Sequence, residues 1–352
     1  MHKDNRDYSL DIIRIIACMM VICIHTVVTE FYTPKVQSST WGILNFYDTI
    51  SRPGVPLFFM ISGSLMLRND RIEIKDLWKR KIFRIAAIFV IWIVFYYVID
   101  TGLKYVLREP NNALKDIFTA ENKYHLWYLR SLISLYALSP VFLVLVKKLD
   151  RSTVRYIFIV FIIFNSLRST FLNIPKIPDW ARWPFLLFNV EISENIVYFL
   201  LGYYLSNSQN ELANRFSNRT LVIIYAIFLF LAAFFNHIFA IIINQPSTAL
   251  YGNKSLPVFI ESVCIFTLIR RKFISKNISK NKSNILKMVS RSTLFVYLIH
   301  PFFIDRMSKN FNYSILDFNV LISVPFTVFA IFIIGTFIGV LLERIPVINK
   351  IL

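Results

Sequence analysis

The sequence predicts an all-α, polytopic integral membrane protein with about ten transmembrane helices. Three observations predict this fold class. Of the 352 residues, 56% are hydrophobic and only 17% are charged, a balance that soluble domains do not show. The apolar residues form runs long enough to cross a hydrocarbon layer about 30 Å thick. Lys and Arg gather in alternate loops between these runs, as they do in chains that cross a bilayer repeatedly.

The predicted spans follow one another along the whole chain. They lie at 9–29, 48–67, 82–99, 126–146, 156–172, 190–206, 220–243, 255–270, 293–306 and 319–342. The sixth span is the weakest, because polar residues crowd its start. Pro53 and Pro56 open the second span, and Pro301 interrupts the ninth. Because proline removes a helical hydrogen bond, we expect these two segments to be bent or re-entrant.

The distribution of charge gives the orientation. The chain has 39 Lys and Arg against 21 Asp and Glu, a formal net charge of +18. Most of the basic residues fall on the side that holds both ends of the chain, in the loops 68–84, 147–155, 215–219 and 270–291. The positive-inside rule therefore predicts that both termini are cytoplasmic. Since topology and contact with membrane lipids explain the charge, we expect no nucleic-acid partner.

The chain is expected to form one transmembrane domain over 1–352, without a separate soluble domain. It has only 8 Gly, no linker rich in Gly, Ser or Pro, and no visible internal repeat. The first apolar run is too long for a cleavable signal and carries ionisable residues near its start. Its three Cys lie inside apolar runs, which indicates small buried residues and not a disulfide framework.

The first span carries the most informative polar residues: Asp11, Arg14 and His25. Arg14 and His25 are eleven residues apart, so on a helix they point within about 20° of each other, about 16 Å apart along the axis. Asp11 lies one turn before Arg14, where it can pair with the guanidinium and offset the cost of burying it. The alternative is that Asp11 and Arg14 form an ion pair at the membrane interface, and that His25 is a hydrogen-bonded polar residue at the outer boundary.

Two features follow in the next spans. Ser62 and Gly63 lie mid-span, where small residues allow helices to pack closely. Arg80, Lys81 and Arg84 form a cationic patch just before the third span, which suits lipid headgroups or a phosphate-bearing cofactor. Positive-inside sorting alone would also produce such a patch.

Further polar residues lie at two span boundaries. His125, Trp127 and Arg130 stand at the outer mouth of the fourth span, where aromatic residues also form the interfacial belt. An Arg inside an apolar span usually faces a carboxylate or a hydrated cavity. His300 precedes Pro301, which frees a backbone carbonyl one turn earlier, so His300 is expected beside polar backbone.

Taken together, these pieces resemble the membrane-bound acyltransferase-three family of bacterial inner membranes. The resemblance rests on an Arg and a His separated by ten residues in the first span, and on four further pieces in the same order. These pieces are Arg14 and His25 after Leu10-Asp11, Val55–Gly63, the triplet Arg80, Lys81 and Arg84, Tyr124–Trp127, and Tyr297 with His300. The resemblance covers nearly the whole chain and is closest to members that O-acetylate surface polysaccharides such as enterobacterial common antigen.

The resemblance implies an O-acyltransferase, most simply an O-acetyltransferase, that moves an acyl group from acyl-coenzyme A to a hydroxyl of a surface polysaccharide or its polyprenyl-linked precursor. His25 would act as the base. Arg14 is too far from His25 to be the oxyanion donor for the same carbon, so with Asp11 it would stabilise the cofactor arm or balance charge. Arg130 and Ser62 are the candidate oxyanion donors.

The same resemblance assigns the two substrates. Acetyl-coenzyme A, a co-substrate and not a bound cofactor, would dock on Arg80, Lys81 and Arg84. The sugar acceptor would meet the residues at the outer mouth. These acceptor residues are His125, Trp127, Arg130 and His300. The five His are scattered without acidic residues at ligand spacing, so we expect no metal.

Two departures and two alternatives accompany this interpretation. Lys81 stands where the family often has Arg, which weakens bidentate phosphate recognition at that position. No extracytoplasmic domain is expected after the last span. A transporter or flippase of lipid-linked sugars would also have many spans with intramembrane Arg, His and Asp. A membrane module without chemistry of its own is a third possibility. Coenzyme A binding distinguishes the enzyme from the transporter, and the shared helix face of Asp11, Arg14 and His25 argues against the module.

Overall fold

The computed structural model describes residues 7–102, 108, 123–187, 191–206, 216–274 and 279–345, and these residues form helices without strands. The all-α prediction is confirmed for this part of the chain. The chain divides into two compact units, one of residues 1–65 and 149–340 and the other of residues 66–148 and 341–352.

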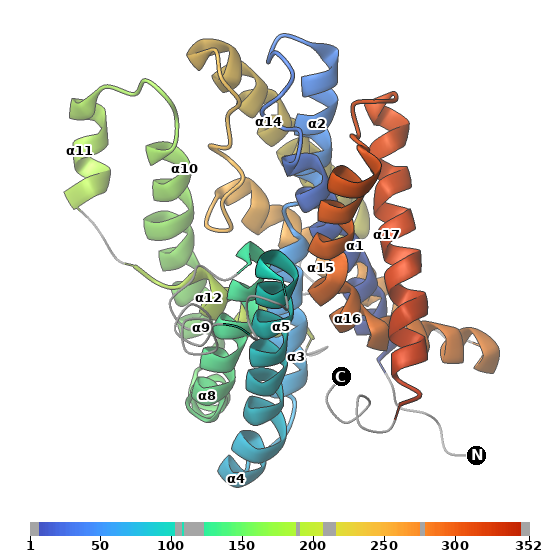
Figure 1. The fold of residues 1–352 in the computed structure, drawn as a ribbon. Helices are drawn as coiled ribbons and strands as arrows, with labels where there is room; N and C mark the ends of the chain where they lie inside the picture. Colours follow the sequence, from blue (N-terminus) through green and yellow to red (C-terminus); the bar gives the residue numbers. More distant parts are fainter. Residues whose placement is uncertain are drawn as a thin grey trace. The chain divides into compact units, whose positions relative to one another are not determined.

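The larger unit contains the first helices and the C-terminal half of the chain (Figure 1). Its helices are α1 (Tyr8–Val28), α2 (Ser39–Ser51), α3 (Gly54–Met66, whose last residue belongs to the other unit), α9 (Arg151–Phe161), η3 (Ile162–Leu167), α10 (Arg168–Leu172), α11 (Asp179–Leu187), α12 (Glu194–Ser206), α14 (Asn218–Ile243), α15 (Leu256–Phe273), α16 (Lys280–Phe311) and α17 (Val320–Leu342, whose last two residues belong to the other unit). Helix α1 packs against α16, α2 and α15, and α14 packs against α15 and α2.

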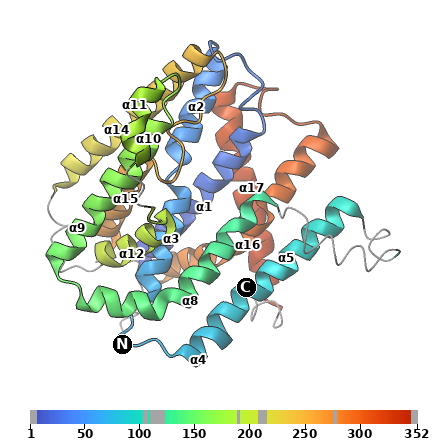
Figure 2. The same cartoon turned by 90° about the vertical axis from the view of Figure 1, so that its left-hand side faces the viewer.

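The smaller unit is built on two long helical segments that lie side by side (Figure 2). The first segment consists of α4 (Ile74–Asp76), the π-helical turn η1 (Leu77–Ile82) and α5 (Phe83–Thr101), and the second of the 3₁₀ turn η2 (Tyr124–Leu126) and α8 (Trp127–Lys148). Trp92 and Tyr96 of α5 are buried in this unit.

Six helical segments in the described residues are long and apolar enough to cross a membrane. They are Tyr8–Val28, Ile74–Thr101, Tyr124–Lys148, Ser152–Leu172, Asn218–Ile243 and Val320–Leu342. The other four predicted spans also coincide with helices, but these are short, as in α2, α3 and α12, or carry polar residues, as in α15 and α16. The chain is thus a multi-pass helical membrane protein, and the count of ten spans stays a prediction.

The proline-containing spans behave differently from each other. The second span is broken, because α2 ends at Ser51 and α3 begins at Gly54, with Pro53 between them. The ninth is not broken: α16 runs through Pro301 as one helix from Lys280 to Phe311. Helix α16 is therefore not interrupted at Pro301, since a helix can continue past proline when another donor takes the freed carbonyl. A bent or re-entrant course of this segment stays a prediction.

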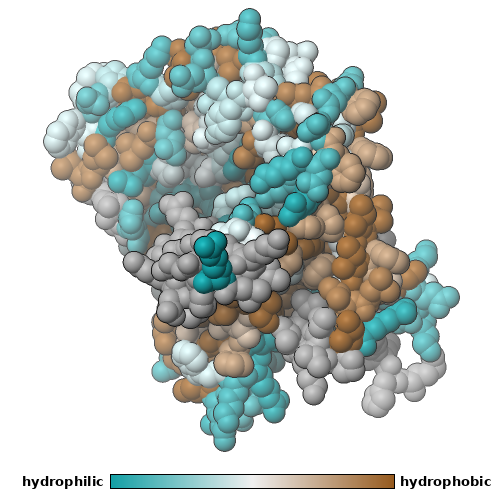
Figure 3. All heavy atoms as spheres, in the orientation of Figure 1, coloured by the Kyte–Doolittle hydropathy of each residue, from teal (hydrophilic) through white to brown (hydrophobic). Residues whose placement is uncertain are grey.

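The surface of the larger unit fits a bilayer along α17. Helix α17 exposes large apolar side chains along most of its length, visible as brown atoms in Figure 3. The most exposed of these are Ile322, Phe326, Ile333 and Phe337, each more than 60% accessible. Such a continuous apolar surface is costly in water and favourable against lipid tails.

Helices α3 and α12 pack at backbone distance, and glycines make this possible. A Cβ added to Gly63 would lie 1.7 Å from the carbonyl oxygen of Phe199, and one added to Gly202 would lie 1.9 Å from that of Met60. The predicted packing role of Gly63 is therefore confirmed. Ser62, its neighbour, donates to the carbonyl of Phe58 in its own helix (2.9 Å).

Candidate functional site

Asp11 and Arg14 form a buried polar network with the facing helix α16. The Arg14 Nη1 lies 3.7 Å from the Asp11 Oδ1, so the predicted ion pair is confirmed. Ser290 of α16 completes it: its hydroxyl donates to Asp11 (2.6 Å) and accepts from Arg14 Nη1 (3.1 Å). Asp11 is 3% exposed. One charge pair and one hydroxyl together satisfy groups that would be costly to bury alone.

His25 meets His300 farther along the same two helices. Their ring centroids are 5.2 Å apart and the ring planes are inclined by 27°, so the imidazoles are stacked. His300 is fully buried, whereas His25 is half-buried. The predicted base is therefore in contact with a second imidazole, and the residue is only partly buried.

Aromatic side chains from two helices complete the surroundings of His300. The Tyr297 ring lies 5.9 Å from the His300 ring and 6.0 Å from the ring of Phe58 on α3. The Nδ1 of His300 lies 2.6 Å from the backbone carbonyl oxygen of Tyr297. The histidines thus lie among aromatic rings, and the contact with the Tyr297 carbonyl helps to hold the orientation of His300.

The α1–α16 contacts follow one register along parallel helices. Arg14 meets Ser290, the Cys18 thiol donates to the carbonyl of Thr293 (3.6 Å), and His25 meets His300. The eleven residues from Arg14 to His25 and the ten from Ser290 to His300 rise by about 16 Å and 15 Å. Arg14 and His25 therefore both contact α16, at two separate levels.

The cationic patch lies at the start of the long segment in the smaller unit. The side chain of Arg80 is 79% exposed and is 3.5 Å from Asp76, while Lys81 donates to the sulfur of Met66 (3.2 Å). Arg84 is also exposed. Arg80 and Lys81 lie on the π-helical turn η1, a type of segment frequent at functional sites. The patch therefore presents two exposed guanidinium groups, and Lys81 contacts a neighbouring helix.

Three of the four residues predicted for the acceptor also lie in the smaller unit, whereas His300 lies in the larger one. His125 is 1% exposed and meets the edge of the Tyr96 ring (5.3 Å between centroids). The Lys123 Nζ lies 5.5 Å from the centre of the Tyr96 ring and 3.4 Å from the Asp100 carboxylate. His125 is thus held inside an aromatic and cationic cluster of α5 and η2, which a sugar could contact only through its rim.

Trp127 and Arg130 occupy the first turn of α8. Trp127 is half-buried, which leaves part of its indole accessible. Arg130 is exposed, in contrast to the expectation that it would face a carboxylate or a hydrated cavity inside the protein. An exposed guanidinium this close to a helix end can extend toward the interface, where lipid headgroups and water solvate it.

The predicted site residues therefore fall into two groups. Asp11, Arg14, His25 and His300 are brought together along α1 and α16 in the larger unit. The remaining residues lie in the smaller unit. They are Arg80, Lys81, Arg84, His125, Trp127 and Arg130.

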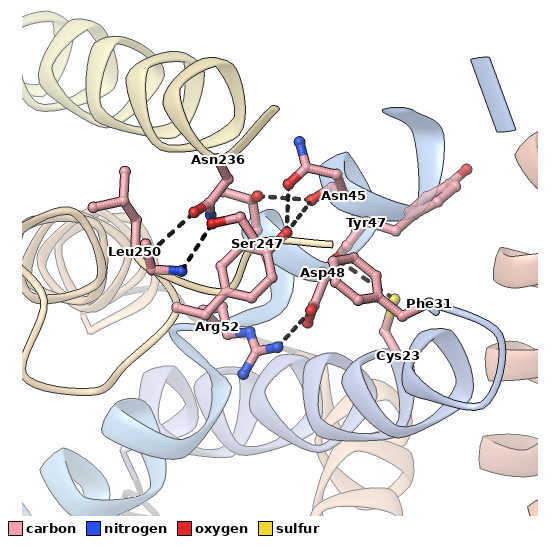
Figure 4. Close-up of polar contacts among 12 residues, drawn as sticks. Cys23, Phe31, Asn45, Tyr47, Asp48, Arg52, Asn236, Ser247 and Leu250 are labelled. Carbon is pink, nitrogen blue, oxygen red and sulfur yellow. Dashed lines mark hydrogen bonds and ion pairs between the residues drawn. The ribbon is translucent and has the colours of Figure 1, made fainter. Parts of the chain in front are cut away.

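Sequence reasoning missed a second buried ion pair in the larger unit, between Asp48 and Arg52 of α2 and its C-terminal cap (Figure 4). Asp48 is 0% exposed, and the Arg52 guanidinium lies 4.3 Å from the centre of the Tyr251 ring. The Tyr251 hydroxyl in turn donates to Asn45. The i, i+4 spacing of opposite charges inside an apolar span was the signal that could have found this pair.

This cluster connects α2 to α14 and α1. The Asn45 amide donates to the carbonyl of Ala233 (2.8 Å), and Asn236 accepts from the Leu250 amide (3.1 Å). The Cys23 thiol donates to the carbonyl of Tyr47 (3.8 Å). Cys23 lies two residues before His25, so the cluster holds α1 in place just before the histidine. His237 packs against another residue of α2, Trp41, at 5.4 Å between ring centroids.

Glu261 of α15 is a third polar residue that the sequence did not single out. It is 0% exposed, and neither carboxyl oxygen has a hydrogen-bond partner among the described residues. A lone acid in the span 255–270 was the available signal, because intramembrane carboxyl groups are rare without a function. In the described residues no group of three or more His, Cys, Asp or Glu could hold a metal ion.

The chain has several apolar spans, and charged and imidazole groups lie between two of its helices. It is therefore a multi-pass membrane protein with an intramembrane polar site. The family model described as an acyltransferase domain, Acyl_transf_3, matches residues 7–344. The chain belongs to this acyltransferase-3 family.

One curated relative carries a different name. A protein of Enterococcus faecalis named amino-acid racemase is 26% identical over 234 residues, which make up 64% of this chain and 31% of that protein. The match thus spans less than a third of the relative's length. No solved structure matches the chain.

Proposed function

We propose that the protein is an integral-membrane O-acyltransferase, specifically an O-acetyltransferase, that transfers an acyl group from acyl-coenzyme A to a hydroxyl of a cell-surface polysaccharide or its lipid-linked precursor. The family supports acyl transfer. The observation that carries the proposal is the half-buried His25 stacked on the buried His300. A histidine that is reachable on one side and held on the other is suited to move a proton to and from a substrate.

The reaction would proceed with His25 as the general base. His25 takes the proton of the acceptor hydroxyl while the hydroxyl oxygen forms a bond to the thioester carbon. The carbon–sulfur bond then breaks, and the proton on His25 neutralises the coenzyme A thiolate. Asp11 and Ser290 orient the Arg14 guanidinium about 16 Å away along α1, where it would stabilise the pantetheine or phosphate portion of the donor.

The donor would dock on the cationic patch. Coenzyme A carries several phosphate charges, and Arg80, Lys81 and Arg84 are exposed basic groups at the start of the Ile74–Thr101 segment. With both termini in the cytoplasm of a bacterial cell, this patch lies on the inner face of the cell membrane. Acyl-coenzyme A is made on that side.

The acceptor would bind at the opposite end of the same unit. Trp127 offers a partly accessible ring face on which a sugar can stack, and Arg130 can bond to ring hydroxyls or to a lipid-linked pyrophosphate. His125 positions this end through Tyr96. A glycan or a polyprenyl-linked sugar fits these chemistries.

The test is transfer of label from donor to glycolipid. Membranes containing the wild type, His25→Ala or His237→Ala are incubated with radiolabelled acetyl-coenzyme A and host glycolipid, and alkali-labile ester is measured. His237 is the matched control, because it also lies in a spanning helix and packs against an aromatic ring. We expect label with the wild type and the control but not with His25→Ala. Undiminished transfer by His25→Ala would refute the mechanism.

Glu261 favours one second candidate, a transporter or flippase of lipid-linked sugars. A fully buried carboxyl group without a hydrogen-bond partner is typical of proton-coupled transport. Loss of glycolipid translocation in Glu261→Gln, together with absent coenzyme A binding by the wild type, would support this candidate over acyl transfer.

A further inference from the structure

The bond between His300 and Tyr297 exists because of Pro301. In a regular helix the carbonyl of Tyr297 would accept from the backbone N–H four residues later, but residue 301 is proline and has none. The structure places the His300 Nδ1 there instead, 2.6 Å from the carbonyl oxygen. The side chain that precedes the proline thus replaces the missing backbone donor.

Elsewhere in the chain, a serine hydroxyl satisfies a backbone carbonyl that a proline has freed. In α8, Pro140 frees the carbonyl of Tyr136, and the hydroxyl of Ser139 donates to it (2.7 Å). A serine before the proline is therefore sufficient to satisfy such a carbonyl. Filling the hydrogen bond alone does not require an imidazole at position 300.

The carbonyl fixes the chemical form of the imidazole. A carbonyl oxygen can only accept, so the Nδ1 of His300 must carry the proton. The neutral ring then has its lone pair on Nε2, and full burial of the ring favours this neutral form. His300 therefore presents a neutral, oriented ring to the stacked ring of His25.

We infer that His300 is a positioning residue for His25: the Tyr297 carbonyl released by Pro301 holds His300 in the Nδ1–H form, and the neutral ring keeps His25 in place as the only imidazole that takes the proton. This inference rests on the proposed function. A neutral aromatic face stabilises an adjacent cation, whereas a charged one would repel it. The stacked ring thus favours the imidazolium that His25 becomes during transfer.

Three variants separate this role from a structural one. His300→Ser keeps a donor for the carbonyl, as at Ser139, but removes the ring. Pro301→Ala restores a backbone donor that competes for the carbonyl. Pro325→Ala is the matched control, because Pro325 also lies inside a helix and the Tyr47 hydroxyl takes its freed carbonyl at Leu321 (2.8 Å).

We expect kcat for acetyl transfer to fall about 10-fold or more in His300→Ser and about 3-fold or more in Pro301→Ala, a part of the 10²- to 10⁴-fold that general-base catalysis contributes. The KM for acetyl-coenzyme A should stay unchanged in both, and Pro325→Ala should retain wild-type kcat. Wild-type kcat in His300→Ser would overturn the inference, since a carbonyl-filling side chain would then suffice.

A spectroscopic measurement of the His300 tautomer tests the inference independently of acyl-transfer activity. In protein labelled with ¹⁵N-histidine, the Nδ1–H form has a distinct pair of nitrogen shifts, and Pro301→Ala should move this pair. A wild-type His300 in the Nε2–H form would overturn the inference even if His300→Ser fails to fold. If His25→Ala abolishes transfer but the tautomer is wrong, the inference fails and the proposed function stands. If the tautomer is right and no acyl transfer occurs, the proposed function fails.

Discussion

Replacing Gly63 with Ala should weaken the packing of α3 against α12. Among the glycines of the larger unit, only Gly202 should be comparably sensitive to an added methyl group. The new Cβ would lie 1.7 Å from the Phe199 carbonyl oxygen, and contacts under 3.0 Å essentially never occur. The two backbones must therefore separate by about 1.3 Å, because a carbonyl oxygen cannot rotate away as a side chain can.

The free energy follows from this displacement. Overpacking a well-packed core costs about 1–3 kcal/mol when side chains can shift, so forcing two backbones apart should cost at least the upper end of that range, about 3 kcal/mol. The better helix propensity of Ala over Gly returns about 1 kcal/mol. We expect a net loss of about 2 kcal/mol or more.

The assay is the thermal stability of the purified protein in detergent, measured by the fraction that remains monodisperse after heating. Gly252→Ala is the control, because a Cβ there meets nothing within 4 Å. Gly63→Ala and Gly202→Ala should each lower the midpoint. The double variant should lose less than the sum, because one separation of the helices relieves both clashes. Equal midpoints for Gly63→Ala and Gly252→Ala would refute the packing argument.

Three further predictions follow from other polar contacts. Asp48→Asn should destabilise the larger unit by about 3 kcal/mol, because Arg52 keeps its charge beside a neutral group, and Asp48→Asn combined with Arg52→Met should recover part of the loss in the same heating assay. Ser290→Ala should lower the free energy of unfolding by about 1–3 kcal/mol, since both hydrogen bonds of Ser290 to α1 are lost. Ser290→Thr, which keeps the hydroxyl, should retain most of the wild-type thermal midpoint. Hydrogen bonds from Ser152 and Thr153 lower the pKa of Asp150 to about 2. The carboxylate therefore stabilises the start of α9 fully at pH values above the ordinary Asp pKa of about 4, and this stabilisation is lost as the pH falls toward 2. Amide exchange in the first turn of α9 should therefore be faster in Asp150→Ala than in the wild type at pH 7, and the difference should vanish near pH 2.

Hydropathy predicted where most helices lie, because the length of an apolar run is a local property. The span predicted at 9–29 is α1 at Tyr8–Val28, and that at 319–342 is α17 at Val320–Leu342. Local patterns did not predict α11, a short helix of mixed polarity at Asp179–Leu187, or the polar first turns of α16 before residue 293. Helices that do not cross the bilayer lack the long apolar run that makes the others visible.

The partners of the site residues could be predicted only within one helix. Spacing alone paired Asp11 with Arg14, because i, i+3 neighbours on a helix are close whatever surrounds them. Spacing could not show that Ser290 completes this pair, since 276 residues separate it from Arg14. The Asp48–Arg52 pair was equally local, but its burial depends on Tyr251 and on helices far along the chain.

The parallel course of α1 and α16 explains why two polar sites coexist in one apolar interface. Parallel helices rise equally, so the contact of Arg14 with Ser290 fixes which residue of α16 lies beside each later residue of α1. The ion pair, which is costly to bury unless every group is bonded, therefore sets the register, and this register brings His25 to His300. A change at Asp11 or Ser290 should act on the histidines without touching them, through the alignment of the two helices and not through charge.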